Sequence, residues 1–167
     1  MSNVFEIERR YLIRYPELRE LDRIGEKTEI VQTYLLPDDV WNTNRVRKRG
    51  RDGEYVYTHT RKRRVSSLTR IEEELIISES EYSALLEQKD PSRNEINKFR
   101  YCCEYKGKMF EIDIFSFWND RAILEIELSS EDESFDLPPF VEVVREISTD
   151  GRYTNASLAK EIPFETI

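Results

Sequence analysis

Hydrophobic and polar residues alternate over much of this 167-residue chain with the period of two that is typical of β-strands. The first such stretch covers residues 4–12 and places Glu6, Glu8 and Arg10 on one strand face. Short turns, such as the Asp-Gly pair at 52–53, separate most of the later stretches and predict β-hairpins. The eight predicted strands are 4–12, 29–36, 44–50, 54–63, 68–77, 94–105, 108–117 and 122–129. Long strands joined mainly by hairpins predict a mainly β (α+β) fold, an eight-stranded antiparallel closed barrel with a few flanking helices.

Apolar residues at helical spacing interrupt this strand pattern in three places. Ser78 and Glu81 form a capping-box pattern at the start of the second of these segments. The predicted helices cover 15–24, 78–90 and 153–160. Residues 131–139 have the composition of an acidic linker, and 141–147 are predicted as a ninth strand or an edge segment. We expect residues 1–167 to form one domain.

Charged or hydrogen-bonding residues recur two positions apart on seven of these strands. Residues with that spacing share one strand face. The pairs are Glu6/Glu8, Arg45/Arg47, Thr60/Lys62, Glu72/Glu74, Lys98/Arg100, Glu111/Asp113 and Glu125/Glu127. A small barrel usually fills its interior with apolar side chains. A lumen lined by these charges therefore needs water and ligand, because unpaired buried charge costs several kcal/mol.

The basic and the acidic residues of these pairs indicate two different ligands. Arg and Lys match phosphate oxygens, whereas clustered carboxylates suit Mg²⁺ or Mn²⁺. His59 is the only histidine, and no C-x-x-C spacing occurs, which argues against a zinc site. The competing interpretation is a purely structural network of cross-strand salt bridges.

The net charge of −8 is unevenly distributed, since residues 45–70 carry a net +8 and the remainder −16. This distribution favours a small anion that enters a pocket over a nucleic acid, which an acidic exterior would repel. The chain shows no signal-peptide pattern and no apolar run of the roughly 20 residues that a membrane helix needs. We therefore expect a cytoplasmic protein without a membrane partner, and leave a homodimer open.

The ordered motifs resemble the CYTH superfamily, or triphosphate tunnel metalloenzymes, of the short bacterial type. The family signature E-x-E-x-K is matched by residues 6–10. The later matches are R-x-R at 45–47, T-x-K at 60–62, R-x-E-x-E at 70–74, K-x-R-Y at 98–101, E-x-D at 111–113, E-x-E at 125–127 and a similar tail over 150–159. The resemblance covers nearly the whole chain and implies a barrel tunnel that binds a triphosphate with a divalent metal ion.

The resemblance also implies roles for individual residues. The implied metal ligands are Glu6, Glu8, Asp113, Glu125 and Glu127. The implied triphosphate clamp is Arg45, Arg47, Lys62, Lys98 and Arg100, with Arg70 as an additional donor. Glu72 and Glu74 would orient the cations or a second metal, and Tyr34 corresponds to a tunnel tyrosine that pairs with the signature lysine in the family.

Two departures from the family pattern matter for the chemistry. Arg10 replaces the signature lysine, and because a guanidinium is effectively never deprotonated, its catalytic role would be orientation or phosphate binding rather than proton abstraction. The T-x-K register is open as well, because Thr58 and Arg61 compete with Thr60 and Lys62.

Three functions remain open at this point. The favoured one is metal-dependent hydrolysis of a small-molecule triphosphate, most readily inorganic tripolyphosphate, because no pocket for a base is evident. The alternatives are a class IV adenylyl cyclase that makes cyclic AMP from ATP, and a non-catalytic polyphosphate- or RNA-binding module that uses the basic run 61–64.

Overall fold

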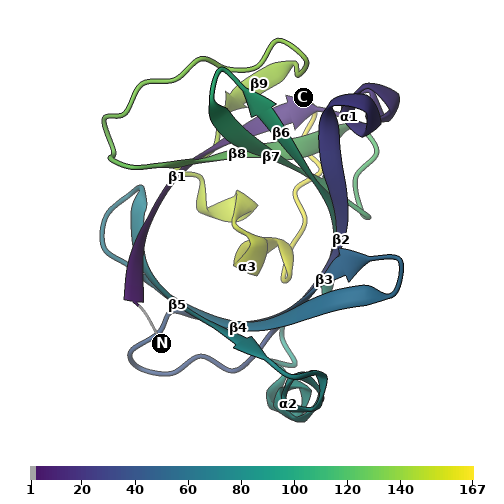
Figure 1. The fold of residues 1–167 in the computed structure, drawn as a ribbon. Coiled ribbons are helices and arrows are strands. Elements are labelled where there is room, and N and C mark those ends of the chain that lie inside the picture. The colour runs from purple at the N-terminus through teal and green to yellow at the C-terminus, as the bar shows by residue number, and fades with distance from the viewer. Residues whose placement is uncertain (1–2) are drawn as a thin grey trace.

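The computed structural model describes residues 3–167 and shows a closed barrel of eight antiparallel strands with one added strand (Figure 1). The ring follows the order β5-β4-β3-β2-β6-β7-β8-β1, and pairing of β1 with β5 closes it. The strands are β1 (Asn3–Arg14), β2 (Gly25–Tyr34), β3 (Thr43–Arg51), β4 (Glu54–Arg64), β5 (Thr69–Ile77), β6 (Ile96–Tyr105), β7 (Lys108–Phe115), β8 (Arg121–Leu128) and β9 (Val143–Glu146). The predicted mainly β barrel is confirmed, and β9 is the short extra strand, paired with β1.

Two tight hairpins join β3 to β4 and β6 to β7. Asp52 and Gly53 have φ values of 53° and 81°, and Lys106 and Gly107 have 48° and 75°. Two successive positive φ values define the turn whose twist matches that of the flanking strands. These turns fix the register of both hairpins, and with it the face on which each charged side chain lies.

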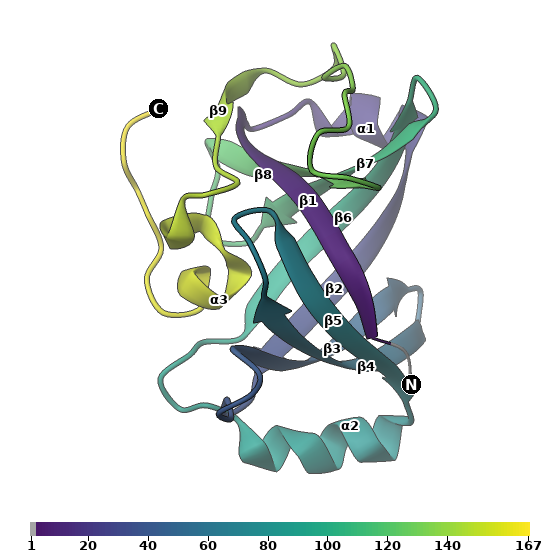
Figure 2. The same cartoon turned by 90° about the vertical axis from the view of Figure 1, so that its left-hand side faces the viewer.

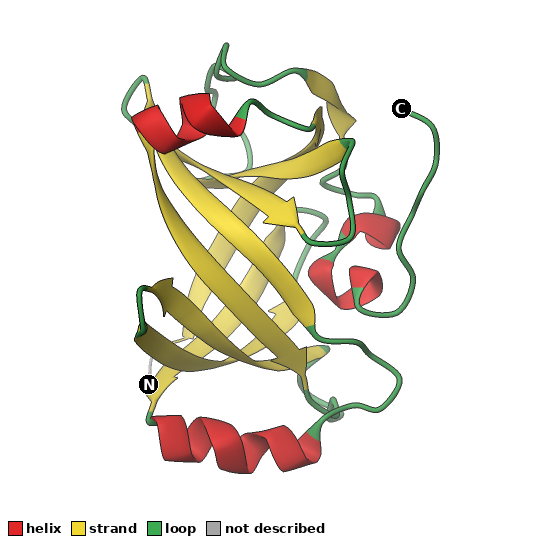
Figure 3. Cartoon of the chain, turned by 90° about the vertical axis from the view of Figure 1, so that its right-hand side faces the viewer, coloured by secondary structure: helices red, strands yellow, loops and turns green. Residues whose placement is uncertain are grey.

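The helices are short and lie at the periphery of the barrel (Figure 3). They are α1 (Leu18–Ile24), α2 (Glu79–Leu85), the 3₁₀ turns η1 (Leu86–Gln88) and η2 (Gly151–Tyr153), and α3 (Asn155–Leu158). Ser78 and Glu81 form the predicted capping box of α2. Among the described residues, no helix is long and apolar enough to cross a membrane.

The predicted helix over 153–160 is wrong in extent. Thr154 has extended backbone angles and ends η2, and its side chain accepts a hydrogen bond from the Ser157 amide to cap α3. The capping geometry therefore divides this segment into two short pieces.

Two large apolar clusters stabilise the barrel at different places. One lies on the outer face of β1, β6, β7 and β8, where α1 and the segment 129–142 cover it. Phe135 belongs to this cover and packs against Tyr11 and Phe110, so the acidic stretch 131–139 is more than a linker.

The second cluster closes one end of the lumen. Leu12, Phe115 and Ile123 continue the lumen-facing side of their strands and pack against Tyr153 and Leu158. Figures 1 and 2 show α3 lying across this end of the barrel. The lumen is therefore apolar at one end and charged along the rest.

Candidate active site

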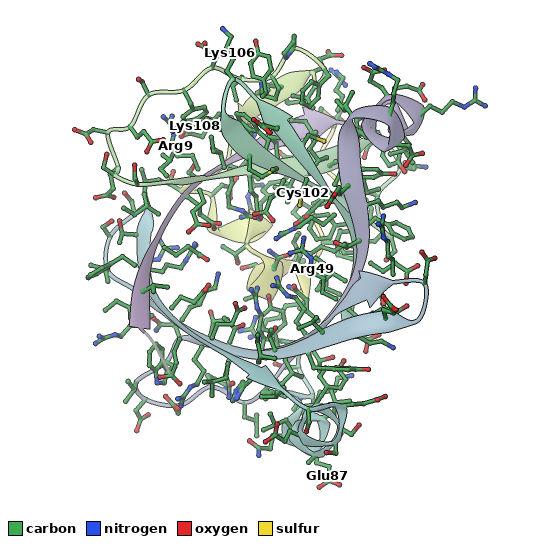
Figure 4. All side chains as sticks on the ribbon, viewed as in Figure 1. Arg9, Arg49, Glu87, Cys102, Lys106 and Lys108 are labelled. Carbon is green, nitrogen blue, oxygen red and sulfur yellow. The ribbon has the colours of Figure 1, made fainter. Side chains whose placement is uncertain are left out.

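Side-chain alternation on the barrel strands directs the charged pairs into the lumen. They surround a chamber of about 200 Å³ whose lining is almost entirely polar. The lining residues are Glu6, Glu8, Arg45, Arg47, Arg49, Lys62, Glu72, Glu74, Arg100, Glu111, Glu125, Glu127 and Asn155. Figure 4 shows the side chain of Arg49 inside the ring of strands and that of Lys106 outside it.

Most residues expected in the site lie in this chamber or next to it. Arg10, Tyr34 and Arg70 line an adjoining mouth of about 290 Å³, which also contacts Glu8, Arg45 and Lys62. Lys98 and Asp113 lie behind the chamber wall, and Asp113 is fully buried.

Three chamber residues were not among the predicted site residues. Glu111 belongs to a charge pair that the sequence placed in the lumen without a specific role, and Arg49 shares the lumen-facing parity of Arg45 and Arg47. Asn155 comes from the C-terminal segment, and its Oδ1 accepts a hydrogen bond of 3.2 Å from Lys98 Nζ. No local pattern indicates that this segment reaches the tunnel.

Acidic and basic side chains pair across the chamber. Lys62 Nζ lies 2.8 Å from Glu6 Oε1 and 3.2 Å from Glu72 Oε2, and Arg70 Nη1 lies 2.8 Å from Glu8 Oε1. Burial would raise the pKa of Glu72, but the nearby positive charge of Lys62 opposes this effect, and the pKa of Glu72 is lowered overall. These carboxylates and cations therefore stabilise one another in the charged state.

The fourth-strand register places Lys62 inside the tunnel and Arg61 outside. Arg61 pairs with Glu73 and lies over the Trp41 ring. Thr60 Oγ1 donates a 3.0 Å hydrogen bond to Glu74, whereas the buried Thr58 hydroxyl has no partner. Thr60 and Lys62, rather than Thr58 and Arg61, make ion-pair or hydrogen-bond contacts with lumen carboxylates.

A buried charged cluster supports the chamber from behind. Arg100 Nε and Nη2 bind the two oxygens of Asp113 at 2.7 and 2.8 Å, and Lys98 Nζ binds Oδ2 at 2.7 Å. Burial alone would raise the pKa of Asp113, but the charges of Arg100 and Lys98 hold it well below its usual range. Burial lowers the pKa of Lys98 to about 8 against the attraction of Asp113. Both Asp113 oxygens are thus occupied by cations.

Several buried donors in the lumen have no acceptor within the described chain. They are Arg10 Nη2, Arg45 Nε and Arg47 Nε. The carboxylate nearest to the Arg47 guanidinium is that of Glu74, at a distance of 3.8 Å. Burial, together with the nearby charges of Arg45 and Arg100, lowers the pKa of Arg47 to about 10. Unsatisfied buried donors are costly, so the lumen has unused capacity for an oxygen-rich anion.

Tyr34 and Arg10 occupy different environments at the mouth. The Tyr34 hydroxyl accepts a 3.0 Å hydrogen bond from Gln32 Nε2, and the Tyr34 side chain is 3% exposed. Arg10 Nε donates to Glu125 Oε1 at 3.1 Å, and Glu125 together with Glu8 raises the arginine pKa despite the opposing effect of burial. Arg10 is therefore held as a cation, which excludes it as a base in this state.

The carboxylates offer the donor chemistry of a hard-cation site. Their oxygens suit Mg²⁺ or Mn²⁺, and burial followed by repulsion from Glu6 and Glu111 raises the pKa of Glu127. Within residues 3–167, no three acidic, histidine or cysteine side chains converge closely enough to hold one metal ion. Because Glu6 and Glu8 are paired with Lys62 and Arg70, metal binding there requires these ion pairs to separate.

Comparisons with known proteins support the fold. No protein-family model matches the chain, and no curated protein matches its sequence. The crystal structure of the inorganic triphosphatase NE1496 is 28% identical, has a TM-score of 0.59, and is aligned over 94% of this chain and 99% of that one. A second structure of NE1496, described as a hypothetical protein, gives 28% identity, a TM-score of 0.60 and coverages of 95% and 99%.

More distant structures share the architecture. A candidate adenylate cyclase from Bacillus halodurans has 18% identity and a TM-score of 0.57, with 78% of this chain and 84% of that chain aligned. At this identity the likeness concerns the fold alone. Together with the ordered charge pairs inside a closed barrel, these similarities show that the chain has the tunnel fold of the CYTH superfamily.

Proposed function

We propose that this protein hydrolyses triphosphates with the help of Mg²⁺ or Mn²⁺, and that inorganic tripolyphosphate is its preferred substrate. The observation that carries the proposal is that the lumen contains both basic and acidic side chains. Buried arginine donors without acceptors lie there beside a set of carboxylates. The similarity to the inorganic triphosphatase NE1496 over nearly the full length of both chains adds support.

Phosphate binding is assigned to the cations. Arg45 and Arg47 have free buried donors, and Lys62 and Arg70 would exchange their carboxylate partners for phosphate oxygens. Arg100 would add positive charge from the chamber wall, and Lys98 from behind it. Arginine can bind two phosphate oxygens at once, which fixes the orientation of the triphosphate as well as its position.

Metal binding is assigned to the acids of β1 and β8. Glu6, Glu8, Glu125 and Glu127 would hold the ion, which supplies charge neutralisation at the phosphates and a more acidic bound water. Glu72 and Glu74 would orient Lys62 and Arg47, which they already contact at 3.2 and 3.8 Å. Asp113 is assigned a supporting role instead, because Lys98 and Arg100 occupy both of its oxygens.

The reaction is an in-line displacement in which water attacks the terminal phosphorus and gives up a proton to a nearby lumen carboxylate. The bond from that phosphorus to the bridging oxygen breaks, and the products are orthophosphate and the shortened phosphate chain. Arg10 would stabilise negative charge in the transition state, and the Tyr34 hydroxyl, held by Gln32, would donate a hydrogen bond at the mouth.

An inorganic substrate is favoured by the composition of the chamber wall. None of its described lining residues is aromatic, and the wall is almost entirely polar, so it offers no aromatic surface on which a base could stack. An organic triphosphate would have to leave its organic group outside the chamber.

The decisive test is an assay of phosphate release from tripolyphosphate, ATP, GTP and thiamine triphosphate, with Mg²⁺, with Mn²⁺ and with excess chelator. We expect metal-dependent orthophosphate release that is fastest with tripolyphosphate. Formation of cyclic AMP and pyrophosphate from ATP would show a cyclase instead. Tight binding without turnover of any substrate would show a non-catalytic module.

A further inference from the structure

The mouth of the tunnel continues the anion site beyond the chamber. The two cavities share Glu8, Arg45, Lys62 and Asn155, so they are adjoining parts of one channel. The chamber contains more carboxylates than cations in its wall, whereas Glu8 is the only carboxylate of residues 3–167 that lines the mouth. The cations that line the mouth are Arg10, Arg45, Lys62, Arg64 and Arg70. Positive charge is therefore concentrated where a phosphate chain would leave the chamber.

Arg64 is the outermost of these cations and has no function in the proposed reaction. It is the last residue of β4, it shares the lumen-facing parity of Lys62, and it lies directly opposite Arg70 in the β4–β5 pairing. Like charges at directly opposed positions destabilise a sheet. Arg70 is neutralised by Glu8 at 2.8 Å.

Arg64 has no comparable partner among the described residues. Its Nη1 donates only to the backbone carbonyls of Ser66 and Ser67, at 3.4 and 3.2 Å, and no described carboxylate lies within ion-pair distance. An anion placed between Arg64 and Arg70 would relieve their repulsion and satisfy the free guanidinium donors. The mouth therefore presents one exposed guanidinium, that of Arg64, without a carboxylate partner among the described residues.

The remaining lining identifies the class of anion. Asn42, Thr43 and Thr154 supply short neutral polar groups, and Tyr34 is the only aromatic residue in the wall. Because Tyr34 is 3% exposed and its ring is covered by Arg93, it offers no free face for stacking. Hydrogen-bonding groups without a stacking surface suit an inorganic phosphate chain better than a nucleoside.

We propose that the mouth binds the additional phosphates of linear polyphosphates longer than tripolyphosphate, with Arg64 as the contact that recognises chain length. This inference rests on the proposed function, because it assumes that three phosphates occupy the chamber. The basic run 61–64 does not form a nucleic-acid patch, since Arg61 is engaged by Glu73 on the outer surface while Lys62 and Arg64 face the lumen.

The test is calorimetric binding of tripolyphosphate and of a longer linear polyphosphate in the presence of Mg²⁺. All proteins carry Glu127→Gln, at a proposed metal ligand that lines the chamber and not the mouth, so that the ligand is not consumed. Arg64→Ala is compared with Arg63→Ala, which removes the same charge from the neighbouring residue on the outer strand face. We expect Arg64→Ala to weaken binding of the longer chain about tenfold, the effect of one charged hydrogen bond, and that of tripolyphosphate by less than about twofold. Arg63→Ala should change neither affinity by more than about twofold.

Three results would overturn the inference. Equal weakening of longer-chain binding by Arg64→Ala and Arg63→Ala would indicate general electrostatics, and equal weakening of the binding of both ligands by Arg64→Ala would show no recognition of chain length. A 5′-triphosphorylated RNA bound more tightly than polyphosphate in an Arg64-dependent manner would assign the mouth to RNA. Binding of tripolyphosphate without hydrolysis by the parent protein would contradict the triphosphatase proposal, yet leave a chain-length effect of Arg64 measurable.

Discussion

Asp113 accepts two hydrogen bonds from Arg100, at 2.7 and 2.8 Å, and both groups are buried, Arg100 in the wall of the chamber and Asp113 behind it. The same carboxylate also accepts from Lys98 at 2.7 Å. One anion therefore bridges two buried cations, of which Arg100 also pairs with Glu111 at 2.7 Å. The arrangement holds Lys98 and Arg100 in fixed positions next to the chamber.

Replacing this anion should destabilise the protein strongly. In Asp113→Asn, Lys98 and Arg100 lose their shared counter-charge, and removing one partner of a buried ion pair costs about 3–5 kcal/mol. Urea unfolding measures the loss. The matched control is Glu142→Gln, which removes a carboxylate paired with Arg14 on the surface and should cost less than about 1 kcal/mol. Equal stabilities of the two variants would show that Asp113 does not hold the cluster together.

Glu8→Gln is expected to abolish turnover while leaving the fold intact. The substitution keeps the shape of the side chain but removes a charge proposed to hold the metal ion and now paired with Arg70 at 2.8 Å. Phosphate release and circular dichroism measure the two effects, and excess chelator should reproduce the loss of activity in the parent protein. Glu146→Gln, which alters an outer-face carboxylate paired with Arg9, should retain activity. Full activity of Glu8→Gln would exclude Glu8 from the metal site.

Arg47→Ala should weaken substrate binding without lowering stability. The Arg47 Nε has no acceptor, and burial together with repulsion from Arg45 and Arg100 lowers the pKa of Arg47 to about 10. Removing the side chain therefore removes an unpaired buried donor and a repulsion between cations in the free protein. Loss of a buried phosphate contact is expected to cost roughly 2–4 kcal/mol of binding free energy.

The Michaelis constant and the urea midpoint of Arg47→Ala separate the two effects. Lys48→Ala is the control, because Lys48 is the adjacent residue on the outer face and lies over the Tyr55 ring. An unchanged Michaelis constant in Arg47→Ala would remove Arg47 from the phosphate clamp.

His59 should make stability depend on pH near neutrality. Burial, followed by the charge of Arg61, lowers its pKa from the ordinary value of 6.5. Because the folded pKa lies below the unfolded one, the contribution is present above the unfolded pKa and is lost as pH falls through the folded pKa. The single histidine allows an unambiguous NMR titration alongside unfolding between pH 7 and pH 5. His59→Gln should flatten this part of the profile, and a titration midpoint above 6.5 would contradict the prediction.

The sequence by itself determined the alternation that forms the strands, and through it which side chains share a face. Period-two patterning and the Asp-Gly and Lys-Gly turns required hairpins of fixed register, so Glu6 and Glu8 had to face the same way as Arg10. The capping box at Ser78 likewise placed the start of α2. These features depend on neighbours within a few residues, and for that reason they could be predicted.

Only the tertiary structure decided which charged side chains contact one another and which are buried outside the chamber. Lys98 and Asp113 share the parity of the lining residues, yet closure of the barrel buries them against Arg100 and Asn155. Closure also brings α3 from the end of the chain to the tunnel and leaves Arg64 opposite Arg70. Local pattern fixes the face of a side chain, whereas its depth and partners depend on strand tilt and on contacts between residues far apart in the chain.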